Sequence, residues 1–198
     1  MKLRLLNPCM LLVSLLLTSS CSPHTTIALQ PSAPEPKRLF TCCNLRPAQG
    51  EISDANWYES GSIYNTPSGA LPYGTEVRVV STAAKSFTVE TTDGTRLRFV
   101  VQYGPESGVE YMRKVLREDD PKQPAATYPD SVQDAIFEGR VVKGMTKEQV
   151  VMAIGYPPGH RTEGMNANEW TYWANRFRTY KLQFGRDGTL KSMWGGCR

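Results

Sequence analysis

The stretch Gly144-Met-Thr-Lys-Glu-Gln-Val-Val-Met-Ala-Ile-Gly-Tyr-Pro-Pro158 sets the fold of the last third of the chain. Thr146 can cap the N-terminus of a helix, and Gln149, three residues later, can complete a capping box. Apolar residues then follow at helical spacing: Val150, Val151 and Ile154. Gly155 fits a left-handed C-cap, and the two prolines after it prevent the helix from continuing. The stretch therefore predicts a helix from about 147 to 154.

One more helix and three strands surround this helix in the sequence. Residues 131–138 have the pattern of a short helix that Gly139 can end. Beyond the prolines, apolar and polar residues alternate, which is typical of an antiparallel sheet with one buried face. Strands are expected at 169–173, 179–184 and 189–193. Asp187-Gly188 favours a tight turn between the last two.

One face of this sheet would carry large apolar side chains: Trp170, Tyr172, Tyr180, Leu182 and Phe184. These side chains can leave water only if the two helices lie against them. The sequence therefore predicts an α+β domain over 131–198, in the order helix-helix-strand-strand-strand, with a three-stranded antiparallel sheet.

Five segments of this region follow one another in a characteristic order: Gly144-Met-Thr-Lys-Glu-Gln-Val150, Gly155-Tyr-Pro157, Trp170-x-Tyr172, Phe184 and Asp187-Gly188. The order resembles the SmpA/OmlA (BamE-like) family of outer-membrane lipoproteins, over about residues 132–196. The resemblance implies an α/β sandwich, a periplasmic location, and non-catalytic binding of anionic lipid or of proteins such as the β-barrel assembly machine. A typical member is little more than this domain, whereas here about eighty further residues precede it. The sandwich also resembles secreted inhibitors of β-lactamase.

Residues 39–118 predict a small β-rich domain in front of this one. Residues 71–80 pass from a turn into an alternating strand, and further strands are expected at 87–90 and 96–99, with Asp93-Gly94 as a hairpin turn. Pro72-Tyr-Gly-Thr75, which enters a strand, resembles bacterial SH3-like modules. Residues 109–117 have the spacing of an amphipathic helix, which would cover the sheet or, alternatively, lie on a membrane surface. Residues 119–130 are acidic and proline-rich, which predicts a linker.

The N-terminus has the layout of a lipoprotein signal peptide over residues 1–20. Lys2 and Arg4 precede a short apolar run, and Thr18-Ser-Ser-Cys21 resembles a lipobox in which leucine stands one place too early. We expect acyl chains on Cys21 to hold the chain at the membrane. The serine after Cys21 favours the outer membrane, as in the enterobacterial lipoproteins that the signal resembles. Proline-rich residues 21–38 then predict a tether on the periplasmic side.

Charge and cysteine content narrow the remaining choices. Lys2 and Arg4 leave with the signal, so the net charge falls from +4 to about +2, which argues against nucleic-acid binding. In an oxidising periplasm, Cys197 is expected to pair with Cys42 or Cys43, because adjacent cysteines are poorly placed to pair with each other. The alternative is three reduced thiols. No spacing typical of a metal site occurs, and we expect no cofactor.

A basic group in the last domain is a candidate contact surface for a partner or for lipid phosphates: Arg161, Arg176, Phe177, Arg178 and Lys181. A solvated loop is the alternative reading of this group. The sequence has no nucleophile elbow, zinc-binding helix or phosphate loop, and so predicts no catalysis. We expect a scaffold in outer-membrane assembly or integrity. A cell-wall lipoprotein that binds peptidoglycan through the SH3-like region is the alternative.

Overall fold

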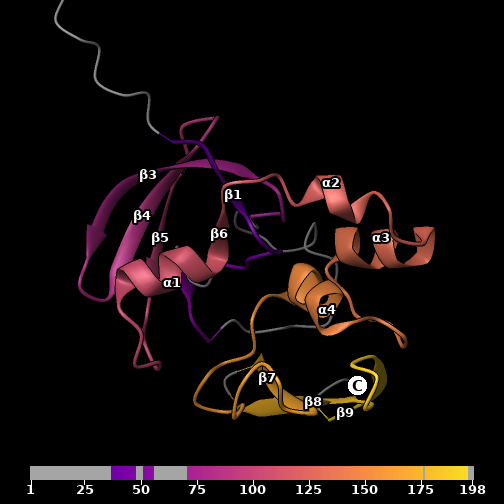
Figure 1. The fold of residues 1–198 in the computed structure, drawn as a ribbon. Helices are drawn as coiled ribbons and strands as arrows, with labels where there is room; N and C mark the ends of the chain where they lie inside the picture. The colour runs from indigo at the N-terminus through magenta and orange to yellow at the C-terminus, as the bar shows by residue number, and fades with distance from the viewer. Residues whose placement is uncertain (1–36, 48–50, 56–70, 176, 196–198) are drawn as a thin grey trace, which may run out of the picture. The chain divides into compact units, whose positions relative to one another are not determined.

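The first sheet is built on a hairpin of β3 (Glu76–Ala83) and β4 (Ser86–Thr91), continued by β5 (Arg96–Val100). The Asp93-Gly94 turn joins β4 to β5, with Gly94 at a φ of +84°. The three strands predicted from alternating residues are thus present (Figure 1). They belong to a computed structural model that describes residues 37–47, 51–55, 71–175 and 177–195.

Three short strands extend this sheet at its edges: β1 (Leu39–Thr41), β2 (Glu51–Ser53) and β6 (Leu116–Arg117). The strand order is β2-β5-β4-β3-β1-β6, with β2 parallel to β5 and the other pairs antiparallel. A register shift between Val79 and Ser81 adds bend and twist to β3. The result is a half-barrel with an SH3-like curl. Strands of two or three residues carry too little alternation to be predicted from sequence.

Helix α1 (Gly108–Val115) covers the aromatic core of this sheet. Phe87 and Phe99 stack with ring centroids 4.4 Å apart, and the Tyr111 ring meets Phe87 edge-on at 5.9 Å. Burial raises the pKa of Tyr111 well above its usual value, so the hydroxyl keeps its proton and donates to the carbonyl of Ser53 at 3.1 Å. The predicted amphipathic helix ends two residues earlier than expected, because the chain enters β6.

The segment 119–130, predicted as a linker, contains the short helix α2 (Lys122–Ala125). The Asp120 carboxylate accepts a hydrogen bond from the backbone N–H of Lys122 at 2.9 Å, and Ala125 is buried. Residues Pro36–Arg198 form one compact unit, and its buried core includes residues of both sheets. The division into one domain over residues 39–118 and another over 131–198 stays a prediction.

Helices α3 (Asp130–Glu138) and α4 (Lys147–Ile154) occupy the predicted positions. Thr146 and Gln149 form the predicted capping box: each side chain accepts a hydrogen bond from the other's backbone N–H. Gly139 ends α3 in the left-handed conformation, at φ +67° and ψ +37°. Gly155 differs from the expected left-handed C-cap, because its φ is +81° but its ψ is extended at −179°. The chain therefore leaves α4 directly into the extended segment that contains the prolines.

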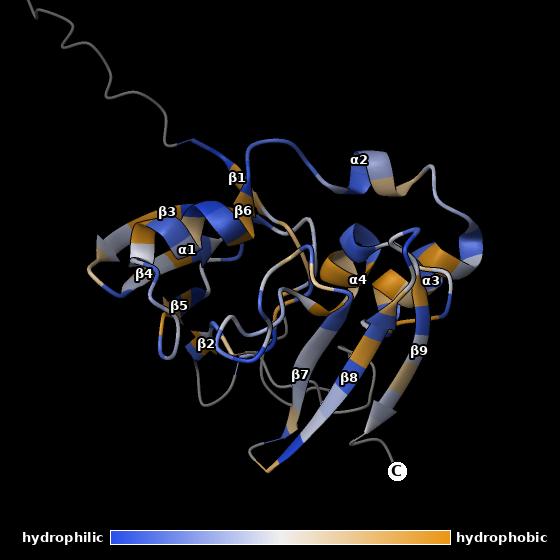
Figure 2. Ribbon diagram, turned by 60° about the horizontal axis from the view of Figure 1, so that its bottom comes forward, coloured by the Kyte–Doolittle hydropathy of each residue, from blue (hydrophilic) through white to orange (hydrophobic). Residues whose placement is uncertain are grey.

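The second sheet consists of β7 (Glu169–Asn175), β8 (Arg178–Phe184) and β9 (Leu190–Gly195), in that order and antiparallel. One face carries the predicted large side chains, each at most 2% exposed: Trp170, Tyr172, Tyr180, Leu182 and Phe184. Helices α3 and α4 lie beside each other next to this sheet (Figure 2). The Tyr172 hydroxyl donates to the carbonyl of Gly155 at 2.9 Å, which fixes the end of α4 on the sheet.

Asn44 joins the two helices to the first sheet. Its side chain is buried, and its amide Nδ2 donates to the carbonyls of Ile136 at 2.6 Å and Ala153 at 3.0 Å. These carbonyls belong to the last turns of α3 and α4, where backbone carbonyls lack the i+4 donors of a continuing helix, although that of Ile136 also accepts from the N–H of Gly139. Its Oδ1 accepts from the backbone N–H of Tyr73 at 2.9 Å. One side chain therefore satisfies backbone groups of three segments.

The fold class is the predicted one. The chain is α+β, with an SH3-like curled sheet followed by two helices and a three-stranded antiparallel sheet. Among the described residues, no helix is both long enough and apolar enough to cross a membrane.

Candidate binding site

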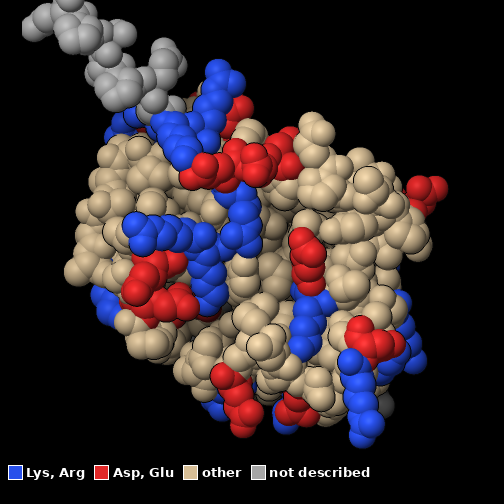
Figure 3. Space-filling view, viewed as in Figure 1, with Lys and Arg blue, Asp and Glu red and all other residues tan. Residues whose placement is uncertain are grey.

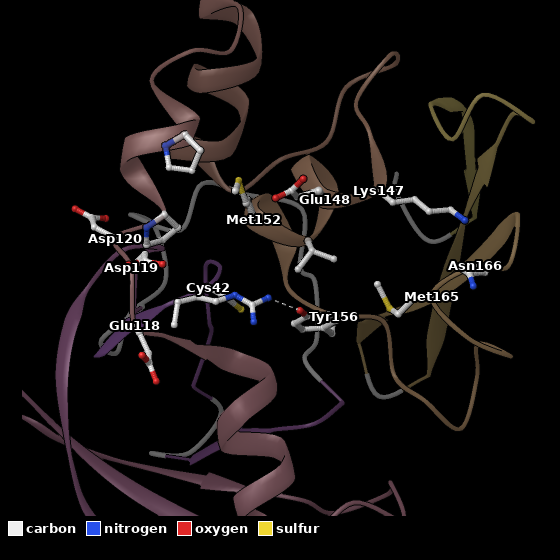
Figure 4. A pocket seen from close by; sticks show the side chains of 14 residues that line it. Cys42, Glu118, Asp119, Asp120, Lys147, Glu148, Met152, Tyr156, Met165 and Asn166 are labelled. Carbon is white, nitrogen blue, oxygen red and sulfur yellow. Dashed lines mark hydrogen bonds between the residues drawn. The ribbon is translucent and has the colours of Figure 1, made fainter. Parts of the chain in front are cut away.

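A cavity of about 620 Å³ lies between the segment after β6 and the outer side of α4. Figure 4 shows that its walls come from parts of the chain that are far apart in sequence. They are contributed by Cys42 and by residues within 117–124, 147–156 and 165–166. A pocket of this size lies within the range typical of small-ligand and side-chain sites.

The floor of the cavity is apolar. Val151 and Met152 reach it from α4 although each is less than 10% exposed, and Tyr156 follows from the segment after the helix. Met165, which is 39% exposed, also lines the cavity, from the segment before β7. Methionine side chains adapt to apolar groups of different shape. The floor can therefore accept an apolar side chain or ring.

An arginine is among the residues that line the cavity. Arg117 leaves β6, and its Nη2 donates to the hydroxyl of Tyr156 at 2.8 Å (Figure 4). Burial raises the pKa of Tyr156, and the nearby guanidinium offsets only part of this effect. The phenol is therefore neutral at physiological pH. No acceptor for the other guanidinium N–H groups is found in the described part of the chain, so they can serve a ligand.

Four carboxylates line the cavity, and they differ in their partners. Glu118 forms an ion pair with Lys37, and Asp120 accepts a backbone hydrogen bond from Lys122. Asp119 and Glu148 have no ion-pair or hydrogen-bond partner within the described ranges. The cavity therefore offers two uncompensated negative charges to a ligand.

A second cation, Lys147, lies at the rim where α4 begins. Its ammonium is 5.7 Å from the centre of the Trp170 ring and 5.5 Å from that of Phe184. Both rings attract a cation through their π faces. Lys147 is thus held toward the sheet. Figure 3 shows acidic and basic side chains interspersed on the face viewed there, without one dominant basic patch.

The two neighbouring cysteines have different surroundings. Cys42 lines the cavity, although it is only 3% exposed, and Cys43 is fully buried away from it. Both are free thiols in the structure, but the predicted partner Cys197 lies outside the described residues, so the disulfide stays a prediction. Burial raises the pKa of the Cys43 thiol well above its usual value, and a hydrogen bond with Cys42 raises it further.

This difference predicts selective alkylation. After reduction of the native protein, we expect iodoacetamide to label Cys42 at least about tenfold faster than Cys43, because the reactive species is the thiolate and the raised pKa keeps Cys43 protonated. Mass spectrometry of the Cys42→Ala and Cys43→Ala variants separates the two rates. Equal labelling would show that the native protein opens around both thiols.

The described members of the basic group predicted as a contact surface lie on and beside strands β7 and β8. The Arg161 guanidinium stacks on the ring of Trp173 at 4.6 Å, and Lys181 forms an ion pair with Glu169 at 2.5 Å. Phe177 is 79% exposed and, with Arg178, lies where β7 turns into β8. Arg176 lies outside the described residues, as does the lipidation site Cys21. Contact of this group with a partner or lipid stays a prediction.

Sequence reasoning missed the cavity altogether. Its main polar contact joins Arg117 to Tyr156, which are 39 positions apart, and each is an ordinary surface residue type by local pattern. The one local signal is Asp119-Asp120 followed by proline, which was interpreted as a linker. Only the tertiary fold brings this segment beside α4.

The described residues contain no metal-binding cluster, and the chain has no match among known proteins. Within residues 37–47, 51–55, 71–175 and 177–195, no cluster of three or more histidine, cysteine, aspartate or glutamate side chains could hold a metal ion. No protein-family model, curated protein or solved structure matches the chain.

Proposed function

We propose that the chain is a lipid-anchored periplasmic protein of the bacterial outer membrane that binds envelope partners without catalysing a reaction. In this role it acts as a scaffold in outer-membrane protein assembly or envelope integrity. The observation that carries the binding part of the proposal is the cavity beside α4, with its apolar floor and its two uncompensated carboxylates. The lipid anchor rests on the lipobox-like residues before Cys21.

Several features support a binding role for the cavity. It is apolar at the base and has a few polar groups at the walls, the composition by which proteins usually position a ligand. Arg117 is held in place by Tyr156 before any ligand arrives. Pre-positioned groups lower the cost of ordering on binding.

The test is recovery of partners by the full-length lipidated protein from solubilised envelopes. We expect Met165→Trp, which narrows the cavity from its exposed wall, to reduce co-purified partners roughly tenfold, since a blocked central pocket removes the main contact. Val80→Trp is the matched control, because Val80 is similarly exposed on β3 and does not line the cavity. Equal recovery by both variants would refute the role of the cavity.

A peptidoglycan-binding lipoprotein is the second candidate, and the SH3-like curl of the first sheet favours it. The same purified protein, incubated with peptidoglycan sacculi and pelleted, separates the two candidates. Retention on sacculi together with loss of protein partners would favour the cell-wall role. If mass spectrometry of the native protein finds no acyl groups on Cys21, the membrane anchor assumed in both candidate functions is refuted.

A further inference from the structure

Resting on the proposed function, we propose that the cavity beside α4 binds an extended segment of a partner protein in which an apolar side chain is flanked by lysine or arginine. Three features of the cavity favour this ligand: its apolar floor, its acidic charge and the guanidinium of Arg117 that lines it. Each is independent of the predicted family resemblance and of the lipid anchor.

The floor selects the apolar side chain. Val151, Met152 and Tyr156 contribute carbon surface to the cavity, and Met165 adds a thioether. An apolar group that enters removes this surface from water, which is the main favourable term in association. A purely polar ligand would leave these groups without a matching partner.

The charge balance selects a cation beside that side chain. Four acidic residues line the cavity against two basic ones, and Asp119 and Glu148 stand on different walls without a partner in the described part of the chain (Figure 4). Glu148 is in the first turn of α4, where the helix dipole also favours a negative charge. Asp119 is in the loop after β6 and has no such role. Lysine or arginine residues on the two sides of the apolar side chain could compensate one carboxylate each.

The guanidinium of Arg117 favours a ligand with peptide carbonyl oxygens over an isolated cation. Its Nη2 is already engaged by Tyr156, which fixes the plane of the group within the cavity. Its remaining N–H groups can donate to carbonyl oxygens, and an extended peptide presents such oxygens without a helix or sheet to occupy them. The same peptide could thus accept hydrogen bonds from Arg117 and pair its cations with the carboxylates.

The test measures binding of three labelled nonapeptides to the full-length protein by fluorescence anisotropy. The central sequences are Lys-Leu-Lys, Glu-Leu-Glu and Lys-Ser-Lys in a glycine-serine background. We expect Lys-Leu-Lys to bind at least about tenfold more tightly than either of the others, because only it supplies both features. The double variant Asp119→Asn/Glu148→Gln should weaken Lys-Leu-Lys binding about five- to tenfold. Glu163→Gln, an exposed acid outside the cavity, should change nothing.

The outcomes separate this inference from the proposed function. Equal binding of the three peptides, no binding of any, or no effect of the double variant would overturn the peptide assignment. Displacement of Lys-Leu-Lys by soluble peptidoglycan fragments at lower concentration would assign the cavity to the cell wall and also overturn it. Partner recovery that depends on Met165 would stand in each of these cases, because it does not depend on the ligand's charge.

Discussion

Replacing Asn44 by alanine is expected to lower the free energy of unfolding by about 2–4 kcal/mol. The substitution leaves the carbonyl of Ala153 and the backbone N–H of Tyr73 without their buried partner, and Ile136 loses one of two donors to its carbonyl. Each buried polar group left without a partner costs roughly 1–3 kcal/mol. Urea denaturation followed by tryptophan fluorescence measures the change.

Asn168→Ala is the matched control. The Asn168 side chain is exposed and has no hydrogen-bond partner among the described residues, whereas its backbone carbonyl accepts from the N–H of Phe184. Its replacement should stay within about 0.5 kcal/mol of the parent protein. A loss below about 1 kcal/mol for Asn44→Ala would mean that water replaces the amide and that the joint between α3, α4 and the first sheet is not built on this residue.

A second large effect is expected for Gly108→Ala, at the first position of α1. A methyl group at Gly108 would lie 2.5 Å from the carbonyl oxygens of Ala83 and Ser86, and 2.6 Å from the backbone nitrogen of Ser86. These are backbone atoms of the β3–β4 hairpin, so the clash cannot be relieved by rotating a side chain. We expect a destabilisation of about 3 kcal/mol, the upper end of the usual cost of overpacking. Thermal and urea unfolding should both report it.

The control for this substitution is Gly164→Ala. No heavy atom outside its neighbours lies within 4 Å of the added methyl group, and the backbone there is not in the left-handed region. The change should be neutral or stabilise the protein by up to about 1 kcal/mol, because alanine restricts the unfolded chain. Equal stability of the two variants would show that α1 can move away from the hairpin at little cost.

The second half of the fold follows closely from local sequence. The capping residues Thr146 and Gln149 define the start of α4, and Gly139 ends α3 where expected. The alternation around Trp170 and Tyr180 places both rings in the core. These signals are strong because each depends on residues two to four positions apart, whose spacing the strand or helix period fixes directly. The fold class could therefore be predicted.

The contacts that connect the helices and strands to one another could not be predicted. β1, β2 and β6 are too short to show a period, and β2 finds its parallel partner β5 across a long stretch of chain. Asn44 has no local pattern that marks it as a bridge between α3 and α4. Such contacts depend on tertiary packing, which overrides local preference.

The candidate site illustrates the same limit. The predicted contact residues Arg161 and Lys181 contact Trp173 and Glu169 in the structure, and charge pattern alone does not reveal these contacts. Asp119 lies in the segment interpreted as a linker, and its place at a cavity wall arises only when that segment packs beside α4. The family resemblance over residues 132–196 and the lipidation of Cys21 remain predictions.

Site-specific crosslinking in living cells tests the central claim, that the cavity is occupied by a partner. A photoreactive phenylalanine analogue replaces Met165 at the cavity wall or, as control, Val80 on β3, in the full-length protein. We predict that illumination yields a discrete crosslinked protein from position 165 and none from position 80. No crosslink from position 165, or the same crosslinks from both positions, would contradict the account.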